Sequence, residues 1–150
     1  NLYRNIEWPV VVMLAAMIPV GQALETSGIS LNIANFISAS TDGLALPWLI
    51  LMILVITMFV SDIVNNAATA VIMAPIAANL ALQVGQPVEP FLMAVAVGAS
   101  CAFLSPIGHQ CNTLVMAPGN YKFGDYWRLG LPLEFVIVAI SIPMILFVWT

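Results

Sequence analysis

Residues 61–69 are a polar island between two apolar runs and read Ser61-Asp62-Ile63-Val64-Asn65-Asn66-Ala67-Ala68-Thr69. Residues 46–60 contain one threonine as their only polar side chain, and residues 70–82 contain only Asn79. As a helix, each run reaches only about 20–25 Å, against a hydrocarbon core of about 30 Å. We therefore predict a re-entrant helical hairpin over 46–84. Non-helical backbone at that depth persists only where it is buried in protein or lines a wet cavity, so the tip is a candidate binding site.

The composition indicates an all-α integral membrane protein. Hydrophobic residues make up 62% of the chain, charged residues 7%, and the mean hydropathy is +1.05. A soluble domain carries about 25% charged residues. Without a basic cluster, the chain has no electrostatic footprint for nucleic acid. The chain begins without Met and ends on an apolar run, so we expect it to be part of a larger membrane protein.

The other segments predict four further elements. An apolar run predicts a membrane span at 8–24, and apolar residues at helical spacing predict an amphipathic interfacial arm at 29–38. A second polar interruption predicts a discontinuous helix at 90–117, because Pro106 removes a backbone donor and Gly108 loosens the chain. The final span is expected at 131–149. Both polar interruptions lie in otherwise apolar helices, and we place the function there.

The basic residues predict the orientation in the membrane. Arg4 precedes the first span, the hairpin returns the chain to the side it left, and the broken helix then delivers Lys122 and Arg128 to the side of Arg4. Basic residues favour the cytoplasm. We therefore expect loop 118–130 to be cytoplasmic and loops 25–45 and 85–89 to lie on the opposite side. The same parity holds for a re-entrant hairpin and for two full spans.

The two interruptions carry groups that suit ions. Main-chain carbonyls freed by unwinding are ligands for a hard cation such as Na⁺, and helix N-termini favour an anion. Asn65 and Asn66 offer amide oxygen to a cation or amide hydrogen to an anion. Hydroxyl groups come from Ser61, Thr69 and Ser105. Neither interruption has a permanent positive charge, so a bound cation would supply the charge that the anion site lacks.

Three stretches resemble the divalent-anion:sodium symporter family. Residues 62–77, DIVNNAATAVIMAPIA, resemble its second hairpin signature, and residues 102–112, AFLSPIGHQCN, resemble its broken helix. Residues 119–132, GNYKFGDYWRLGLP, resemble its exit into the last helix. The resemblance covers nearly the whole chain. It implies that the chain is the C-terminal end of the second inverted repeat and forms half of an ion-transporter core. It further implies a homodimeric, elevator-type sodium symporter for sulfate or dicarboxylates in the plasma or inner membrane.

The resemblance also implies residue roles. The sodium ligands would be Ser61, Asn66 and the carbonyls of Val64 and Gly108, with Thr69 and Ser105 as possible further ligands. The substrate-binding positions would be Asn65, Asn66, Ala67, His109 and Asn112. The family has Ser-Asn-Thr at the tip where this chain has Asn65, Asn66 and Ala67, and it has Thr-Pro-Pro-Asn where residues 109–112 read His-Gln-Cys-Asn. The lost threonine and the gained histidine fit a permease branch for which sulfate is plausible.

Other interpretations of these residues stay open at this point. Asn65 and Asn66 could make a polar helix–helix contact, and His109 could pack against a carbonyl instead of serving an anion or a proton. Asp62 is expected to be a solvated or capping carboxylate rather than a cation ligand, and Glu134 to be interfacial. The two breaks could instead line a passive channel. An intramembrane serine protease built on Ser100 and His109 would need hydrogen-bond reach and an oxyanion hole, which a separation of nine positions with a break in it does not supply.

Overall fold

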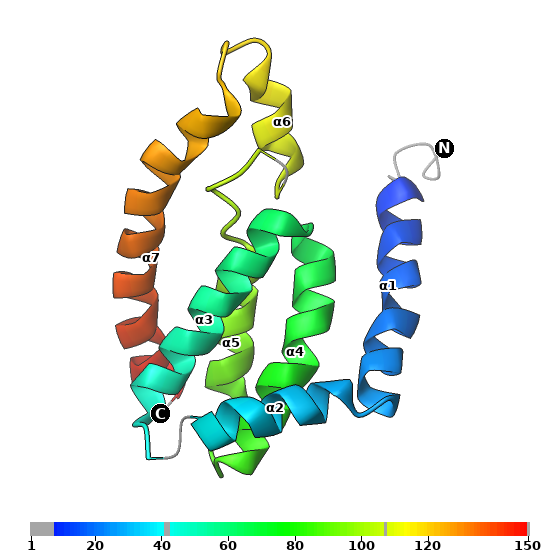
Figure 1. Ribbon diagram of the computed structural model, residues 1–150, viewed down its shortest axis with the longest axis vertical. Helices are drawn as coiled ribbons and strands as arrows, with labels where there is room; N and C mark the ends of the chain where they lie inside the picture. The colour runs from blue at the N-terminus through cyan, green and yellow to red at the C-terminus, as the bar shows by residue number, and fades with distance from the viewer. Residues whose placement is uncertain (1–7, 41–42, 107, 150) are drawn as a thin grey trace.

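The structure is a computed structural model that describes residues 8–40, 43–106 and 108–149, and these residues form helices and connecting segments. Figure 1 shows the arrangement: α1 stands at one edge, α7 at the other, and α3, α4 and α5 lie between them above the transverse helix α2. The helices are α1 (Trp8–Thr26), α2 (Ile29–Ser40), α3 (Leu46–Ile63), α4 (Asn66–Gln83), α5 (Val88–Ala99), α6 (Gln110–Met116) and α7 (Tyr126–Trp149), with a 3₁₀ turn at Phe123–Asp125. This is the all-α membrane class that the composition predicted.

Helices α3 and α4 form a hairpin whose tip is the polar island. Only Val64 and Asn65 separate the two helices, and both have extended backbone. The Asn65 side chain accepts a hydrogen bond from the Ala68 main-chain N–H at 2.8 Å, which makes Asn65 the N-cap of α4. At the far end, Gly85 with φ +66° ends α4, and the Gln86 N–H reaches the Ala81 carbonyl at 2.9 Å.

The arms of the hairpin are longer than the sequence suggested. Each helix has 18 residues, which corresponds to about 27 Å, because the helix extends into the polar island from both sides. Among the residues that the structure describes, three helical segments are long and apolar enough to cross a membrane by length and composition: Leu46–Ile63, Asn66–Gln83 and Phe123–Trp149. The hairpin arms are two of these three, so its re-entrant character stays a prediction.

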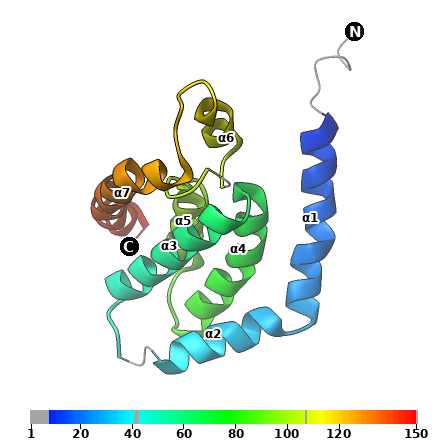
Figure 2. The ribbon, with the colours of Figure 1, turned by 45° about the horizontal axis from the view of Figure 1, so that its top comes forward.

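Helix α5 packs against both arms of the hairpin, as Figure 2 shows from a tilted view. The contact is tight because Gly98 has no side chain: a Cβ there would lie 2.8 Å from the Thr57 Cβ and 2.9 Å from the Leu54 carbonyl oxygen. Small residues that let helix backbones approach are typical of membrane helix packing. The core around this contact consists of fully buried apolar side chains, among them Ile50, Ile53, Leu54, Leu80 and Phe91.

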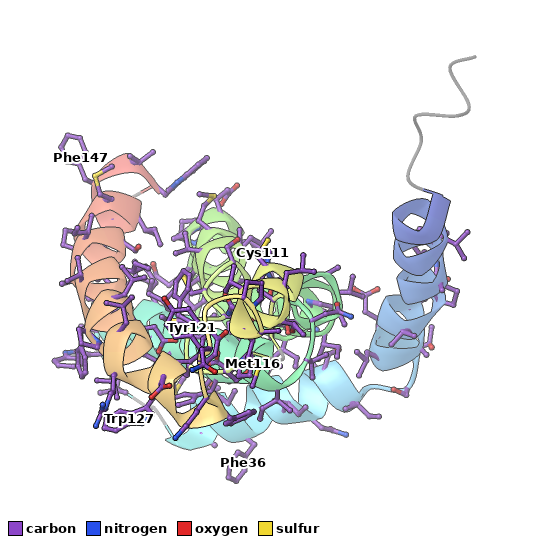
Figure 3. All side chains as sticks on the ribbon, turned by 90° about the horizontal axis from the view of Figure 1, so that it is seen from above. Phe36, Cys111, Met116, Tyr121, Trp127 and Phe147 are labelled. Atoms are coloured by element: carbon purple, nitrogen blue, oxygen red, sulfur yellow. The ribbon has the colours of Figure 1, made fainter. Side chains whose placement is uncertain are left out.

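Helix α2, where an amphipathic arm was expected over 29–38, exposes most of its large apolar side chains, and only Ile37 among them packs partly buried against the core. Ser30 and Ala34 are buried, and Ser30 Oγ accepts a hydrogen bond from Asn79 Nδ2 of α4 at 3.3 Å. Ile29, Ile33 and Phe36 are exposed, and Figure 3 shows Phe36 projecting away from the other helices. Outward apolar side chains are the arrangement expected of a helix that contacts lipid.

The discontinuous helix unwinds earlier than its polar residues suggested. Helix α5 ends at Ala99 and α6 begins at Gln110, and the described residues between them, 100–106 and 108–109, form an unwound segment. The polar interruption in the sequence begins only at Ser105. The main chain leaves the helix sooner because Phe103 and Leu104 contact other elements: a Cβ on Gly130 of α7 would overlap the Phe103 carbonyl, and the Leu104 N–H bonds to Asp62.

We expect Gly98→Val to destabilise the fold by about 1–3 kcal/mol, because the added side chain would force α3 and α5 apart. Ala96→Val on the same helix is the matched control, since Ala96 is exposed. The thermal midpoint of the purified full-length protein in detergent checks this. Equal midpoints for the two variants would show that the α3–α5 contact tolerates a larger separation.

Candidate functional site

The hairpin tip and the unwound segment meet in a small cluster of oxygen atoms. Ser61 Oγ donates to the Ala99 carbonyl at 2.8 Å and lies 3.0 Å from the Asn66 Oδ1. The Asn66 side chain also lies 3.2 Å from the carbonyl oxygens of Ala99 and Gly108. The cluster therefore joins both polar interruptions, through residues that are far apart in the chain. Ser61 is fully buried, so the cluster is shielded on the side of α3.

The Asn66 side-chain amide can take two orientations in this cluster. With its nitrogen inward, it donates to Ser61 Oγ at 3.0 Å and to the Ala99 and Gly108 carbonyls at 3.2 Å each. With its oxygen inward, four oxygen atoms face one another, from Asn66, Ser61, Ala99 and Gly108. Hydrogen bonding favours the orientation with nitrogen inward. A hard cation prefers oxygen ligands, so it would favour the orientation with oxygen inward.

Gly108 lets the unwound segment approach the tip closely. A Cβ at this position would lie 2.7 Å from the Ser61 carbonyl oxygen, 2.6 Å from the Ala102 Cβ and 3.2 Å from the Asp62 Cα. Contacts below 3.0 Å are not compatible with a side chain unless the backbone shifts. Glycine is therefore required for the main chain of the two interruptions to touch.

Asp62 links the tip to the unwound segment by hydrogen bonds. The prediction that it is a solvated or capping carboxylate was wrong. The residue is 7% exposed, and its Oδ1 accepts a hydrogen bond from the Leu104 N–H at 3.0 Å. The Asp62 carbonyl accepts from Ser105 Oγ at 2.6 Å, and Ser105 Oγ in turn accepts from the Gly108 N–H at 3.2 Å. Side-chain oxygen thus replaces the helical partners that the unwound segment has lost.

The structure brings together only part of the predicted sodium set. Ser61, Asn66 and the Gly108 carbonyl lie in the oxygen cluster, and Ser105 lies next to it through its bonds to Asp62 and Gly108. Val64 is the C-cap of α3, has extended backbone and lies two residues before Asn66 in the chain. Thr69 is fully buried one turn into α4, where its Oγ1 has no hydrogen-bond partner among the described residues.

The predicted substrate-binding positions are spread over the same region. Asn65 is exposed and caps α4, and Ala67 is half-buried in the first turn of that helix. His109 is exposed and caps α6, with its Nδ1 accepting from the Cys111 N–H at 3.1 Å. Asn112 is half-buried, and its Nδ2 donates to the carbonyls of Ala102 and Ser105 at 2.9 and 3.1 Å. Asn112 therefore supports the unwound segment directly.

Sequence reasoning missed three contributors. The Ala99 carbonyl could be found only from the point at which α5 ends. The Asp62 bond joins residues that are 42 positions apart, and no local pattern encodes it. Glu134, expected at the interface, has a buried Oε1 without a hydrogen-bond partner among the described residues. An isolated carboxylate in an apolar span was the signal that could have drawn attention to it.

The geometry does not support the serine protease that the sequence left open. Ser100 Oγ donates to the Ala96 carbonyl at 2.8 Å in the last turn of α5, and His109 Nδ1 accepts from the Cys111 N–H. A nucleophile requires its base within hydrogen-bond reach. Each of these two side chains instead serves the end of its own helix.

Apolar helices interrupted at two touching points, with main-chain oxygen at the contact, define the core of a membrane transporter. The chain belongs to the citrate transporter family, because the model of that family matches residues 1–98 and 45–150. It is 38% identical over 97% of its length to an uncharacterised transporter of Synechocystis. It is 33% identical over 92% of its length to a probable sodium/sulfate cotransporter of Chlamydomonas reinhardtii, and 31% identical over 93% to a sodium-dependent high-affinity dicarboxylate transporter of Caenorhabditis elegans.

These comparisons agree with the resemblance to sodium symporters for divalent anions. The family and these three relatives are named as transporters. The chain spans 24%, 16% and 25% of the three relatives' own lengths, so it corresponds to a quarter or less of each protein. The activity of a whole transporter is therefore more than this chain carries alone.

We expect Gly108→Ala to disrupt the site, because the methyl group would push the unwound segment away from the Ser61 carbonyl. Gly124→Ala is the matched control, since a Cβ at Gly124 meets nothing within 4 Å. The effect should be a loss of substrate uptake by the full-length protein in Gly108→Ala, with uptake retained in Gly124→Ala. Normal uptake by both variants would contradict a functional contact between the two interruptions.

Proposed function

We propose that this chain is part of a sodium-coupled symporter that carries a divalent anion, sulfate or a dicarboxylate, across the cell membrane. The observation that carries the proposal is the oxygen cluster at the contact of the two interruptions. Its oxygen ligands would come from a hydroxyl, an amide and two main-chain carbonyls, all uncharged. Uncharged oxygen ligands suit a hard monovalent cation, because no carboxylate is needed to hold it.

The sodium ion would lie between Ser61, Asn66 and the Gly108 carbonyl, with Val64 contributing its carbonyl from the end of α3. Ala99 adds an oxygen that the resemblance did not imply. Thr69 and Ser105 stay further candidates, because both lie within one or two turns of the cluster. Two relatives that are named for sodium-dependent transport support the choice of cation.

The anion would bind beside the sodium ion, where α4 begins. The first turn of α4 presents main-chain N–H groups next to Asn65, Asn66 and Ala67, and a helix N-terminus favours negative charge. His109 borders the same region and is exposed. Because its Nδ1 accepts the Cys111 N–H, the neutral ring carries its proton on Nε2, where it can donate to an anion. Asn112 would act by holding the unwound segment in place.

The remaining features of the proposal concern the whole protein. The first inverted repeat would supply the second half of the transport core, and two copies would form a homodimer that works by an elevator mechanism. Loop 118–130 would be cytoplasmic in the plasma or inner membrane. Of the three basic residues behind that orientation, Lys122 and Arg128 are exposed, and Arg4 lies outside the described residues.

Sodium coupling predicts uphill accumulation of the anion. Proteoliposomes that contain the full-length protein should concentrate radiolabelled sulfate or succinate when an inward sodium gradient is imposed. Collapse of the gradient by a sodium ionophore should abolish the accumulation. Uptake that only equilibrates across the membrane would point to a channel, and a panel of unlabelled competitors would identify the preferred anion.

Asn66→Ala should lower the apparent sodium affinity of uptake by about ten- to hundredfold, because it removes a direct ligand. Asn32→Ala is the control, since Asn32 is exposed on α2. The sodium-concentration dependence of anion uptake measures the effect. An unchanged dependence in Asn66→Ala would remove Asn66 from the site.

His109→Asn should weaken the apparent affinity for the anion. Asparagine is a good N-cap, so the start of α6 is retained, but it does not place an N–H donor where the imidazole carries Nε2. The concentration dependence of anion uptake by the full-length protein measures the effect. Equal apparent affinities for both proteins would return His109 to a capping role alone.

A further inference from the structure

Helix α6 lies beyond the hairpin tip, set off from the bundle of α3, α4 and α5, as Figures 1 and 2 both show. It has seven residues, and none of the other helices that the structure describes packs along it. A helix shorter than about 12–15 residues is marginal without tertiary support. The position of α6 must therefore come from individual hydrogen bonds.

Two adjacent side chains of α6 hold the unwound segment. Asn112 Nδ2 donates to the carbonyls of Ala102 and Ser105 at 2.9 and 3.1 Å. Thr113 Oγ1 donates to the Pro106 carbonyl at 2.6 Å. These bonds satisfy three main-chain carbonyls that have left helical structure, so the unwound segment and α6 are connected as one unit.

The groups proposed to bind both ions lie inside this unit. The bond from Thr113 to Pro106 closes a short loop of the chain, and this loop carries Gly108 and His109. The Gly108 carbonyl belongs to the oxygen cluster, and His109 is the proposed donor to the anion. A shift of α6 would therefore displace a group of the sodium site and a group of the anion site together.

A residue of α7 holds α6 from the other side. Tyr126 Oη donates to the Asn112 main-chain carbonyl at 2.7 Å. Tyr126 is the half-buried first residue of α7, and its ring lies edge-on to that of Tyr121 with the centroids 6.2 Å apart. Asp125 Oδ2 accepts from the Lys122 N–H at 2.8 Å and so fixes the turn that precedes α7. The phenol is therefore presented to α6 from an ordered element.

Packing does not duplicate this bond. An apolar pocket of about 280 Å³ lies between α6 and the start of α7, lined by Asn112 and Val115 from one helix and by Tyr126 and Gly130 from the other. Side chains that face an empty space lose the contacts that a packed neighbour would provide. The pocket also leaves α6 room to move if the bond is lost.

We propose that Tyr126 is a positioning residue of the transport site. Its hydroxyl holds α6, and through α6 it sets the place of the Gly108 carbonyl and of His109. Tyr126 acts through the Asn112 main chain and is not itself a ligand of either ion. The inference rests on the proposed function for the identity of the ions, but the mechanical link between Tyr126 and α6 does not.

Hydrogen–deuterium exchange tests the mechanical link. Tyr126→Phe removes the hydroxyl and keeps the ring, so exchange in the full-length protein in lipid nanodiscs should become faster in α6 and in the unwound segment, and should be unchanged in α3. Tyr121→Phe is the matched control, because it removes the same hydroxyl from an exposed neighbouring ring. Exchange of α6 that is equal in both variants and in the unaltered protein would overturn the proposal.

The sodium dependence of anion uptake tests the effect on the site. Tyr126→Phe should lower the apparent sodium affinity about two- to tenfold, the equivalent of one hydrogen bond, and leave the maximal rate at saturating sodium unchanged. Tyr121→Phe should behave as the unaltered protein. A variant Tyr126→Phe that only yields less folded protein, with the same sodium dependence, would mean a contribution to stability alone and would overturn the positioning role.

Failure of the proposed symport would give a different pattern. Uptake by the unaltered protein would then ignore sodium, while the exchange of α6 would still respond to Tyr126→Phe. In that case the apparent affinity for the anion decides, because Tyr126→Phe should lower it through His109 and Tyr121→Phe should not. Equal anion affinities in the two variants would overturn the positioning role.

Discussion

The constraint on which this structure depends is that main-chain polar groups away from water must find partners within the protein. The unwound residues between α5 and α6 expose such groups at the centre of an apolar bundle. Side chains from two elements satisfy them: Ser61 and Asp62 from the hairpin tip, and Asn112 from α6. Thr113 completes the set with a bond to the Pro106 carbonyl at 2.6 Å. The polar residues of the two interruptions are thus partners of each other's backbone.

Glycine sets how close these partners can come. Gly98 brings α5 against α3, Gly108 brings the unwound segment against the tip, and Gly130 brings α7 against Phe103. The contacts of Gly108 and Gly130 both involve the unwound segment, and Gly98 fixes the end of α5 from which that segment starts. The site is therefore positioned by the absence of side chains as much as by the polar groups that fill it.

The class of fold and the positions of the two interruptions were readable from the sequence, because apolar runs and the polar residues between them are local signals. The polar island at 61–69 and the break near Gly108 both mark real ends of helices. The bond of Asp62 to Leu104 and the burial of Glu134 Oε1 were not readable, since they depend on contacts between distant elements. Helix α2 shows the same limit: its periodicity was visible, but its fully buried residues are Ser30 and Ala34, and of its large apolar residues only Ile37 packs against the core.

The bonds between the tip and the unwound segment also restrict how this part of the molecule can move. Lifting the tip alone would strip the Leu104 amide, the Ala99 carbonyl and the Ser105 hydroxyl of their partners. Each buried group left unpaired costs about 1–3 kcal/mol. A displacement that carries α3, α4 and the unwound segment together breaks none of these bonds. The bonding pattern therefore favours travel as one rigid block over the opening of a flap.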